Sequence, residues 1–319
     1  MSSILVLTNE IFDLPQAAEA EIREIAPEIE LDVVESSFDY SELIKKSEIV
    51  FGWPKTDLVK KSENLKWLHL PSAGVDRYAN KEIYQNQEIV LTNSSGVYGK
   101  PIAEHVFAMI MAYNRNLIDY AYDKKEKKWQ RKNEIKDFFN STVGILGLGD
   151  IGTMIAERAK AWGAQVLALK RTMTELPAYV DQIYLNKDLN KLLSRADYVI
   201  LTLPGTPETE GIIGREELKM MKKSAFIINI GRGSLIKQDD LVEALEKGWI
   251  AGAGLDVTEP EPLPETSKLW ELDNVILTPH TSGFSPTNDQ RRFEIFKANL
   301  KHYLAQEELS NQVDFELKY

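Results

Sequence analysis

Short apolar segments alternate with amphipathic stretches along the whole chain. In the first part, apolar runs of strand length lie at residues 4–7, 31–34, 48–53, 67–70 and 89–92. A second series lies at residues 142–146, 166–169, 198–203, 226–230, 250–256 and 275–278. Residues 17–25 and the stretches between the later runs have apolar residues at helical spacing. Parallel strands buried under helices produce this alternation, so the sequence predicts an α/β protein with two doubly wound parallel sheets.

Two longer helical patterns indicate how the two series are joined. The stretch from Pro101 to Tyr120 has proline in its first turn and apolar residues at helical spacing, so we expect one connecting helix there. A final helix is expected over residues 288–306. The two series therefore form two domains, and the chain could return to the first domain at its end.

Composition narrows the class of protein. The chain has 319 residues, 43% hydrophobic and 27% charged, as in an ordinary globular protein of about two domains. It contains no cysteine, which excludes disulfides, thiolate metal sites and a cysteine nucleophile. We expect a cytoplasmic protein, because the first residues lack the basic region of a signal peptide and no run approaches the ~18 apolar residues of a membrane span.

Charge argues against nucleic acids and membranes as partners. The formal net charge is −11, which repels phosphate backbones and anionic lipids over most of the surface. One basic cluster, Lys124 to Lys132, contains Trp129 and is open to interpretation as a nucleic-acid contact. A solvated helix face, or an arm at an interface between protomers, explains it better. We therefore predict no nucleic-acid partner, no membrane partner and no metal site.

A glycine-rich turn follows the first strand of the second series. Gly147-Leu148-Gly149-Asp150-Ile151-Gly152 places a G-x-G-x-x-G pattern between that strand and a helical stretch. Gly147 permits a tight turn, Gly149 lets the backbone approach a pyrophosphate, and Gly152 lets the helix pack close to the strand. The helix N-terminus adds free N–H groups that bind phosphate. The turn, with Asp150 and Ile151 in it, is predicted to bind a dinucleotide; a glycine turn without a ligand is the alternative.

The end of the next strand indicates which dinucleotide is bound. Proteins that bind NAD usually have Asp or Glu there, which accepts a hydrogen bond from the ribose 2′-hydroxyl. This chain has Lys170, Arg171 and Thr172 instead, two cations and a hydroxyl that suit a 2′-phosphate. We predict NADP(H) as the preferred cofactor, with NAD(H) possible. A solvated strand end without a cofactor contact is the alternative.

Three later strands end on polar residues that suit one reaction. Arg232 follows the fourth strand of the second series, Glu259 and Glu261 follow the fifth, and His280 follows the sixth. Because ligands bind at the carboxyl ends of parallel strands, these side chains could converge. Hydride reduction of a ketone needs a proton donor, which histidine provides, and a carboxylate beside it favours the imidazolium. The guanidinium fork suits both the 2-oxo oxygen and the carboxylate of a 2-oxo acid.

With these residues the chain resembles the D-isomer-specific 2-hydroxyacid dehydrogenases, which include glyoxylate/hydroxypyruvate reductases, D-lactate dehydrogenases and D-3-phosphoglycerate dehydrogenases. The resemblance runs essentially from end to end. It is carried by the glycine motif, Ser72 to Asp76, Ala103-Glu104-His105, Leu203 to Thr209, Asn229 to Gly233, Asp256 to Pro264 and Thr278-Pro279-His280. The fold it implies is a Rossmann-type dinucleotide-binding domain, residues 100–283, inserted in a flavodoxin-like substrate-binding domain made of residues 1–99 and 284–319.

The resemblance also implies a role for each motif residue. The catalytic residues would be Arg232, Glu261 and His280, because the family register favours Glu261 over Glu259. Asp256 would hold the nicotinamide carboxamide. The substrate carboxylate would be bound by Arg232 and by the backbone N–H groups of Ala73, Gly74 and Val75. The residues expected to line the cofactor cleft are Ile102, Leu203, Pro204, Thr209 and Ile230.

Together these observations predict an NADP(H)-dependent reductase that converts a small 2-oxo acid to a D-2-hydroxy acid, with glyoxylate or hydroxypyruvate as first candidates. The alternative is a nucleotide-sensing or corepressor-like binding protein on the same scaffold. Among the other histidines, His69 precedes the Ser72 turn closely enough to approach substrate, whereas His105 and His302 are expected to pack. We expect a homodimer, because the connecting helix is apolar over much of its circumference and the resemblance places it at a two-fold interface.

Overall fold

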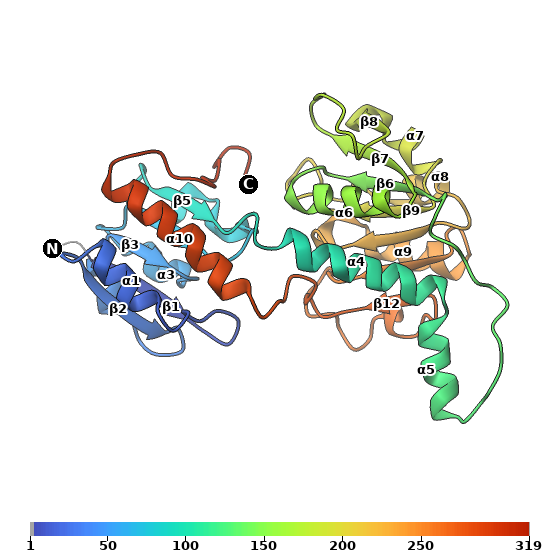
Figure 1. Ribbon diagram of the computed structural model, residues 1–319, viewed down its shortest axis with the longest axis horizontal. Helices are drawn as coiled ribbons and strands as arrows, with labels where there is room; N and C mark the ends of the chain where they lie inside the picture. The colour runs from blue at the N-terminus through green and yellow to red at the C-terminus, as the bar shows by residue number, and fades with distance from the viewer. Residues whose placement is uncertain (1–2, 319) are drawn as a thin grey trace. The chain divides into compact units, whose positions relative to one another are not determined.

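The computed structural model describes residues 3–318, which divide into two compact units (Figure 1). The first unit extends to Val97 and resumes at Ser285, and the second unit is Tyr98–Phe284. The divisions therefore fall after residues 97 and 284, where the sequence led us to expect them after residues 99 and 283. No helix within residues 3–318 combines the length and the apolar character that crossing a membrane requires.

The first unit is built on a five-stranded parallel sheet with the strand order β2-β1-β3-β4-β5. The strands are β1 (Ser3–Thr8), β2 (Glu30–Glu35), β3 (Ile49–Phe51), β4 (Trp67–Leu70) and β5 (Val90–Asn93). The helices are α1 (Ala18–Ile25), α2 (Ser41–Lys46), α3 (Thr56–Val59) and α10 (Asn288–Leu304), with short 3₁₀ turns η1 (Asp76–Tyr78) and η2 (Lys81–Ile83). This strand order is flavodoxin-like, as predicted.

Alternate residues of each strand in the first unit point to opposite faces of the sheet, and both faces are covered. Ile4 and Val6 of β1 pack with apolar residues of α1 and α10, whereas Leu5 and Leu7 pack with residues of α2 and α3. Since both faces are buried, the inner strands β1 and β3 are largely continuous apolar runs, whereas the edge strand β2 contains Asp32 and is partly exposed. The final helix α10 belongs to this unit, which confirms that the chain returns to its first domain.

The second unit contains a seven-stranded sheet with the order β12-β11-β10-β9-β6-β7-β8. The strands are β6 (Thr142–Leu146), β7 (Gln165–Lys170), β8 (Gln182–Leu185), β9 (Tyr198–Leu201), β10 (Phe226–Asn229), β11 (Gly252–Leu255) and β12 (Val275–Leu277). The helices are α4 (Gly99–Asn114), α5 (Leu117–Lys125), α6 (Asp150–Ala161), α7 (Leu189–Leu193), α8 (Arg215–Met220) and α9 (Gln238–Glu246), with 3₁₀ turns η3 (Asn186–Asp188), η4 (Gly233–Leu235) and η5 (Lys268–Trp270).

Helices also cover both faces of the second sheet. Apolar residues of α7, α8 and α9 pack on one face with Val199 of β9 and Ile227 of β10. On the other face Tyr113 of α4 stacks on Phe226, and α4 packs closely against α6. All strand pairs are parallel, and the strand order reverses between β6 and β9, as in a Rossmann-type sheet. The predicted fold class is therefore confirmed for both units.

Two elements differ from the sequence prediction. The expected single helix from Pro101 to Tyr120 is wrong, because α4 ends at Asn114 and α5 begins at Leu117. Asn116 between them has a left-handed backbone with φ of 52°, and its side-chain amide donates to the carbonyl of Glu134 at 3.0 Å. Asparagine tolerates this conformation, which ends a helix without glycine or proline. The edge strand β8 was not predicted, because it has only four residues and is partly exposed.

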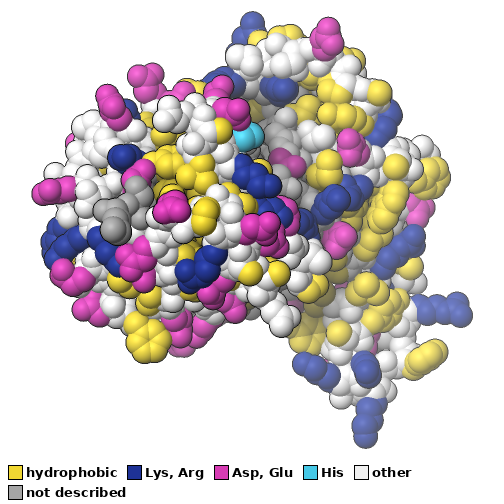
Figure 2. Space-filling view, turned by 60° about the vertical axis from the view of Figure 1, so that its left-hand side comes forward, with side chains coloured by type: hydrophobic (Ala, Val, Ile, Leu, Met, Phe, Trp, Pro, Cys, Tyr) yellow, Lys and Arg dark blue, Asp and Glu magenta, His cyan; other side chains and the backbone are white. Residues whose placement is uncertain are grey.

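Beyond α4 the chain forms an arm, residues 117–137, which consists of α5 and an irregular segment that returns to β6 (Figure 1). The expected basic helix face exists only at Lys124 and Lys125, since the rest of the cluster lies outside the helix. Figure 2 shows Lys and Arg side chains, in dark blue, on the part of the molecule that projects at the lower right of the view. Some are paired with acids, as Lys132 is with Asp123 at 3.1 Å. Trp129 is fully exposed.

Candidate active site

The glycine turn lies where the strand order of the second sheet reverses. Gly147 directly follows β6 and has φ of 101°, a conformation that glycine adopts without strain. The Thr202 hydroxyl, after β9, donates to the Gly147 carbonyl at 2.8 Å and so ties the two central strand ends together. A Cβ on Gly152 would lie 2.1 Å from the carbonyl oxygen of Gly147. Helix α6 can therefore approach the turn this closely only because residue 152 is glycine.

The same turn fits a bound pyrophosphate. Gly149 is exposed at the N-terminus of the 12-residue helix α6, and beyond its own chain neighbours no heavy atom of the described residues lies within 4 Å of the position that a Cβ would take. The backbone here is open to a ligand, and the first N–H groups of α6 face it with the positive end of the helix dipole. Asp150 and Ile151 are the first two residues of α6, the former exposed and the latter half-buried.

The residues expected at the ribose follow the neighbouring strand. Lys170 is the last residue of β7, which pairs with β6 on the side away from β9. Lys170 is half-buried, and Arg171 and Thr172 are exposed beyond the strand end. The three side chains therefore lie at the same carboxyl edge of the sheet as the glycine turn, and no acidic residue stands at this strand end.

Arg232 lies in a tightly held turn after β10. The side chain of buried Asn229 bonds to this turn twice, since its amide donates to the Arg232 carbonyl at 2.8 Å and its oxygen accepts from Gly231 N–H at 3.1 Å. A Cβ on Gly233 would lie 2.0 Å from the carbonyl oxygen of Thr258. The backbone that carries Arg232 therefore packs directly against the backbone that leads to Glu261.

Glu261 and His280 form a hydrogen-bonded pair. The Nδ1 atom of His280 lies 2.7 Å from Oε1 of Glu261, and both side chains are nearly half exposed. Because Glu261 binds Nδ1, the Nε2 atom of His280 is available to another group. Glu259, the other acid of this loop, is exposed, and its backbone N–H faces the Gln238 side chain. The structure thus pairs the histidine with the acid that the family register favoured.

Asp256 lies beneath the histidine loop with a completely buried carboxylate. Its Oδ1 accepts from the Thr281 N–H at 2.9 Å and its Oδ2 from the Ser282 N–H at 3.0 Å. Its own backbone carbonyl accepts from the His280 N–H at 2.8 Å. Three successive N–H groups are therefore held by one residue. A contact between this carboxylate and a nicotinamide stays a prediction.

The remaining residues expected at the cofactor are placed as follows. Ile102 is buried on α4, and Ile230 is buried directly after β10. Leu203 and Pro204 are half-buried after β9, with Thr209 in the same loop. The Thr209 hydroxyl donates to the Pro204 carbonyl at 2.6 Å and thereby shapes that loop. Contact of these five residues with a cofactor stays a prediction.

Besides Arg232, the residues expected at the substrate carboxylate lie in the first unit. Ala73, Gly74 and Val75 form the loop after β4, where the Ser72 hydroxyl donates to the Gly74 carbonyl at 2.7 Å and accepts from Trp53 Nε1 at 3.1 Å. The side chain of His69, on β4, does not reach the surface beside this loop, because it is fully buried. Its ring nitrogens bond to Thr92 and Ser94, and burial lowers its pKa to about 3. His69 is therefore a neutral core residue and has no access to substrate.

Two side chains that organise the site had no role in the sequence prediction. Asn229 clamps the Arg232 turn, and the Thr278 hydroxyl donates to Asp256 at 2.6 Å. Both lie inside motifs that were recognised, but only the distances show what they contact. Within residues 3–318 there is no cluster of three or more acidic or histidine side chains that could hold a metal ion.

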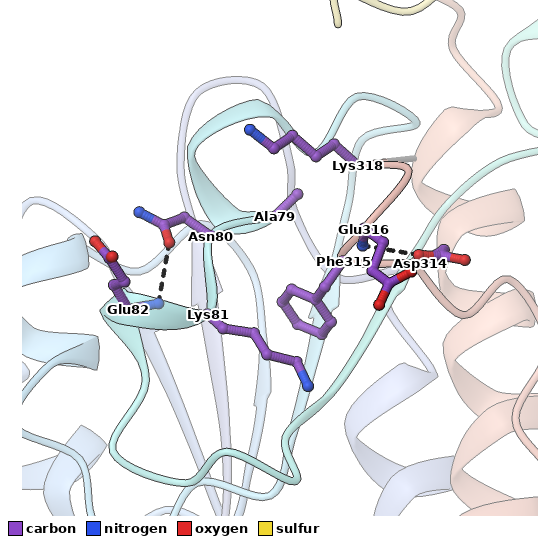
Figure 3. Close-up of a pocket in the computed structure, with 8 residues that line it drawn as sticks. All are labelled: Ala79, Asn80, Lys81, Glu82, Asp314, Phe315, Glu316 and Lys318. Atoms are coloured by element: carbon purple, nitrogen blue, oxygen red, sulfur yellow. Dashed lines mark hydrogen bonds between the residues drawn. The ribbon is translucent and has the colours of Figure 1, made fainter. Parts of the chain in front are cut away.

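A separate open pocket lies in the first unit, between η2 and the C-terminal segment (Figure 3). It is lined by Ala79, Asn80, Lys81, Glu82, Asp314, Phe315, Glu316 and Lys318. The Phe315 ring packs edge-on against Tyr84 with the centroids 5.9 Å apart, which fixes the C-terminal segment on the unit. None of the predicted site residues lines this pocket.

Comparison with known proteins places this geometry in a family. The model of the NAD-binding domain of D-isomer specific 2-hydroxyacid dehydrogenases matches residues 107–282. A glyoxylate reductase from Korarchaeum cryptofilum is 36% identical over 237 residues, which are 72% of this chain and 70% of that protein.

Solved structures agree over the full length. A D-isomer specific 2-hydroxyacid dehydrogenase family protein from Aeromonas salmonicida is 31% identical with a TM-score of 0.85, covering 99% of this chain and 100% of its own. An NADPH-dependent glyoxylate/hydroxypyruvate reductase from Sinorhizobium meliloti, solved with NADP and sulfate, is 25% identical with a TM-score of 0.84 and full coverage of both chains. Since the family model spans more than half of the residues and the folds coincide, this chain belongs to the D-isomer specific 2-hydroxyacid dehydrogenase family.

Proposed function

We propose that this protein is an NADP(H)-dependent reductase of small 2-oxo acids that forms D-2-hydroxy acids, with glyoxylate and hydroxypyruvate as first candidates. The observation that carries the proposal is the bond of 2.7 Å between His280 and Glu261, on a loop next to the Arg232 turn. The glyoxylate reductase and the glyoxylate/hydroxypyruvate reductase among the relatives support the choice of substrates.

In this proposal His280 is the proton donor. When bound, a dihydronicotinamide would supply the hydride for the substrate carbonyl carbon, and negative charge would then develop on the carbonyl oxygen. The Nδ1–H group of His280 is held by the Glu261 carboxylate, so Nε2 carries the proton that passes to this oxygen. The carboxylate also stabilises the imidazolium that the reaction consumes.

The role of Arg232 follows from its chemistry and its fixed backbone. A guanidinium can donate to the 2-oxo oxygen and to the carboxylate of one substrate molecule. Its hydrogen bond to the 2-oxo oxygen becomes stronger as negative charge develops there. The Asn229 clamp and the Gly233 contact keep the Arg232 backbone in one position. The N–H groups of Ala73, Gly74 and Val75 remain the predicted second site for the substrate carboxylate.

An assay panel tests the reaction. Purified protein is mixed with glyoxylate, hydroxypyruvate, pyruvate and 3-phosphohydroxypyruvate, each with NADPH and with NADH, and cofactor oxidation is followed by absorbance. We expect turnover with at least one small 2-oxo acid and a D-configured product wherever the product is chiral. Tight NADPH binding without turnover of any acid would instead favour the nucleotide-sensing alternative.

The cofactor proposal rests on the cations at the end of β7. If Lys170 and Arg171 meet a 2′-phosphate, NADPH has the higher kcat/KM, and salt reduces its advantage by screening partly exposed charges. Lys170→Asp supplies an acceptor for the ribose hydroxyl of NAD and repels the phosphate. With charge-assisted bonds of about 1.5 to 3 kcal/mol, the preference should swing by roughly tenfold to a hundredfold. A preference of the unmodified protein for NADH would overturn this proposal.

The cytoplasmic location expected from the sequence stays a prediction.

A further inference from the structure

A chain of three polar side chains connects helix α4 to the histidine loop. Nε2 of His105, on α4, lies 3.0 Å from the Thr278 hydroxyl. That hydroxyl lies 2.6 Å from Oδ1 of Asp256, and His105 Nε2 lies 3.9 Å from the same oxygen. The His105 side chain is 23% exposed and that of Asp256 is completely buried, so the contacts are largely shielded from water. The proposed mechanism gives no role to His105 or Thr278.

Helix α4 places His105 there for a geometric reason. Met109 lies one turn further along the same face of the helix, and its sulfur comes within 2.9 Å of the position that a Cβ on Gly254 would take. This face of α4 therefore rests on β11, and Asp256 directly follows that strand. The close approach that Gly254 permits brings His105 within reach of the end of β11.

The hydrogens in this chain can be assigned from donor and acceptor chemistry. An ionised carboxylate only accepts, so the single hydrogen of the Thr278 hydroxyl points to Asp256. The Thr278 oxygen is then an acceptor toward His105, whose Nε2 must carry a hydrogen. Asp256 Oδ1 thereby accepts from the Thr278 hydroxyl and from the Thr281 N–H. The order of donation runs from His105 through Thr278 to Asp256.

Asp256, whose carboxylate is held by the Thr278 hydroxyl, in turn holds the backbone of the loop that carries His280. Its backbone carbonyl accepts from the His280 N–H, and its carboxylate accepts from the N–H groups of Thr281 and Ser282. His280 has φ of 53°, a strained conformation for a residue other than glycine, and it persists only if surrounding contacts hold it. Loss of a donor to Oδ1 would let the carboxylate rotate and would loosen the loop that carries the imidazole.

We propose that His105 is a positioning residue for the reaction: it donates through Thr278 to Asp256, which fixes the loop and thus the imidazole of His280. This inference rests on the proposed function, because it assigns His280 the transfer of the proton. In this proposal His105 acts through Thr278 and Asp256 and not by contact with substrate or cofactor. Its contribution is a hydrogen-bond donor at one location, so another donor of similar reach can replace it.

Paired variants separate this role from simple packing. His105→Leu removes the N–H donor and Thr278→Val removes the hydroxyl, both at nearly constant side-chain volume. His105→Gln keeps an N–H donor, and Thr278→Ser keeps the hydroxyl. We expect kcat to fall about tenfold in the first pair, with KM for the 2-oxo acid and the Kd of NADPH changed less than about threefold. The second pair should recover most of kcat. The double variant His105→Leu/Thr278→Val should lose about tenfold and not a hundredfold, because both changes break one chain.

A readout independent of turnover uses the small number of histidines. With ¹⁵N-labelled histidine, four imidazoles appear in the spectrum, and single His→Gln variants assign them. We expect His105 to be protonated at Nε2, and we expect Thr278→Val to move the signals of His105 and His280 without moving that of His302. His302→Gln, in the first unit, is the matched control and should leave kcat unchanged.

Each outcome decides the proposal. A His105 ring with Nε2 unprotonated, or a His280 signal that Thr278→Val does not move, overturns it whether or not the protein reduces a 2-oxo acid. Values of kcat within twofold of the unmodified enzyme in both His105→Leu and Thr278→Val also overturn it. Failure of the unmodified protein to turn over any 2-oxo acid, with both spectral effects present, would refute the proposed function and leave the hydrogen-bond chain established. If His105→Leu fails to fold, Thr278→Val and Thr278→Ser still decide the question.

Discussion

His280 is the residue on which the proposed chemistry depends most directly. His280→Gln retains a polar side chain of similar size but removes the acid. We expect kcat to fall by roughly two to four orders of magnitude, the usual contribution of a positioned proton donor, while the Kd of NADPH changes little. Steady-state kinetics and cofactor titration by fluorescence measure the two quantities. Near-normal turnover in this variant would remove His280 from the mechanism.

Glu261 should fix the orientation of the His280 imidazole. Its carboxylate lies 2.7 Å from His280 Nδ1 and accepts the hydrogen bond that leaves Nε2 for the substrate oxygen. In Glu261→Gln steady-state kinetics should show a lower kcat with little change in the Kd of NADPH, because a neutral amide accepts a weaker hydrogen bond than a carboxylate. Glu259→Gln is the matched control, since Glu259 lies in the same loop and is exposed. Equal kcat values for the two variants would argue against the Glu261 pair.

His69 should make stability depend on pH in a defined direction. Its pKa is lowered from 6.5 to about 3 by burial, so the unfolded chain takes up this proton first as the pH falls. The contribution of His69 to the free energy of unfolding has its full value above pH 6.5. Between pH 6.5 and pH 3 this contribution falls by up to about 1.4 kcal/mol for each pH unit. Urea unfolding of the unmodified protein and of His69→Gln measures it. The difference between the two should shrink with falling pH; a constant difference contradicts the prediction.

At the scale of an element, two glycines of the motif that joins β6 to α6, Gly149 before the helix and Gly152 in its first turn, have opposite sensitivities. An Ala side chain at residue 152 would meet the Gly147 carbonyl at 2.1 Å, whereas residue 149 has open space. Gly152→Ala should therefore destabilise the second unit by about 1 to 3 kcal/mol. Gly149→Ala should unfold like the unmodified protein and yet bind NADPH more weakly. Thermal unfolding and cofactor titration separate the two effects, and identical behaviour of the two variants would refute the assignment.

The strands could be predicted well because burial on both faces makes each one a continuous apolar run. β4 and β6 have the predicted bounds, and the other buried strands differ by a few residues at their ends. The edge strand β8 lacks this signal, since only Tyr184 in it is buried. The break at Asn116 had no glycine or proline to mark it, and the apolar periodicity continues across it. Element boundaries set by a single left-handed residue are therefore the part that periodicity misses.

The candidate site was predictable as far as strand ends and motifs define it. The sequence places Arg232, Glu261 and His280 at carboxyl ends of strands, and the structure adds which pairs touch. The Thr278 bridge and the Asn229 clamp depend on distances between segments that are remote in sequence, so no spacing rule reveals them. His69 illustrates the reverse case, because proximity in sequence to the Ser72 turn did not bring it to the surface.

At the scale of the whole molecule, the reason for expecting a homodimer changes. The apolar residues of α4 that suggested an interface, such as Ile102, Val106 and Ile110, are buried within the second unit. Exposed apolar residues lie instead on the arm, where Leu117, Tyr122 and Trp129 are 54%, 61% and 104% exposed. Large apolar side chains exposed on one segment are typical of a surface that another protein covers.

We therefore predict a homodimer held by the arm. Light scattering at micromolar concentration should give twice the chain mass of 36.2 kDa. Leu117→Asp combined with Trp129→Asp places charges at two exposed apolar positions of the arm and should shift the protein toward monomer. Phe38→Asp is the matched control, because Phe38 is 65% exposed in the first unit and should leave the mass unchanged. A monomeric unmodified protein, or an arm variant that stays dimeric at every concentration, would show that the arm is not the interface.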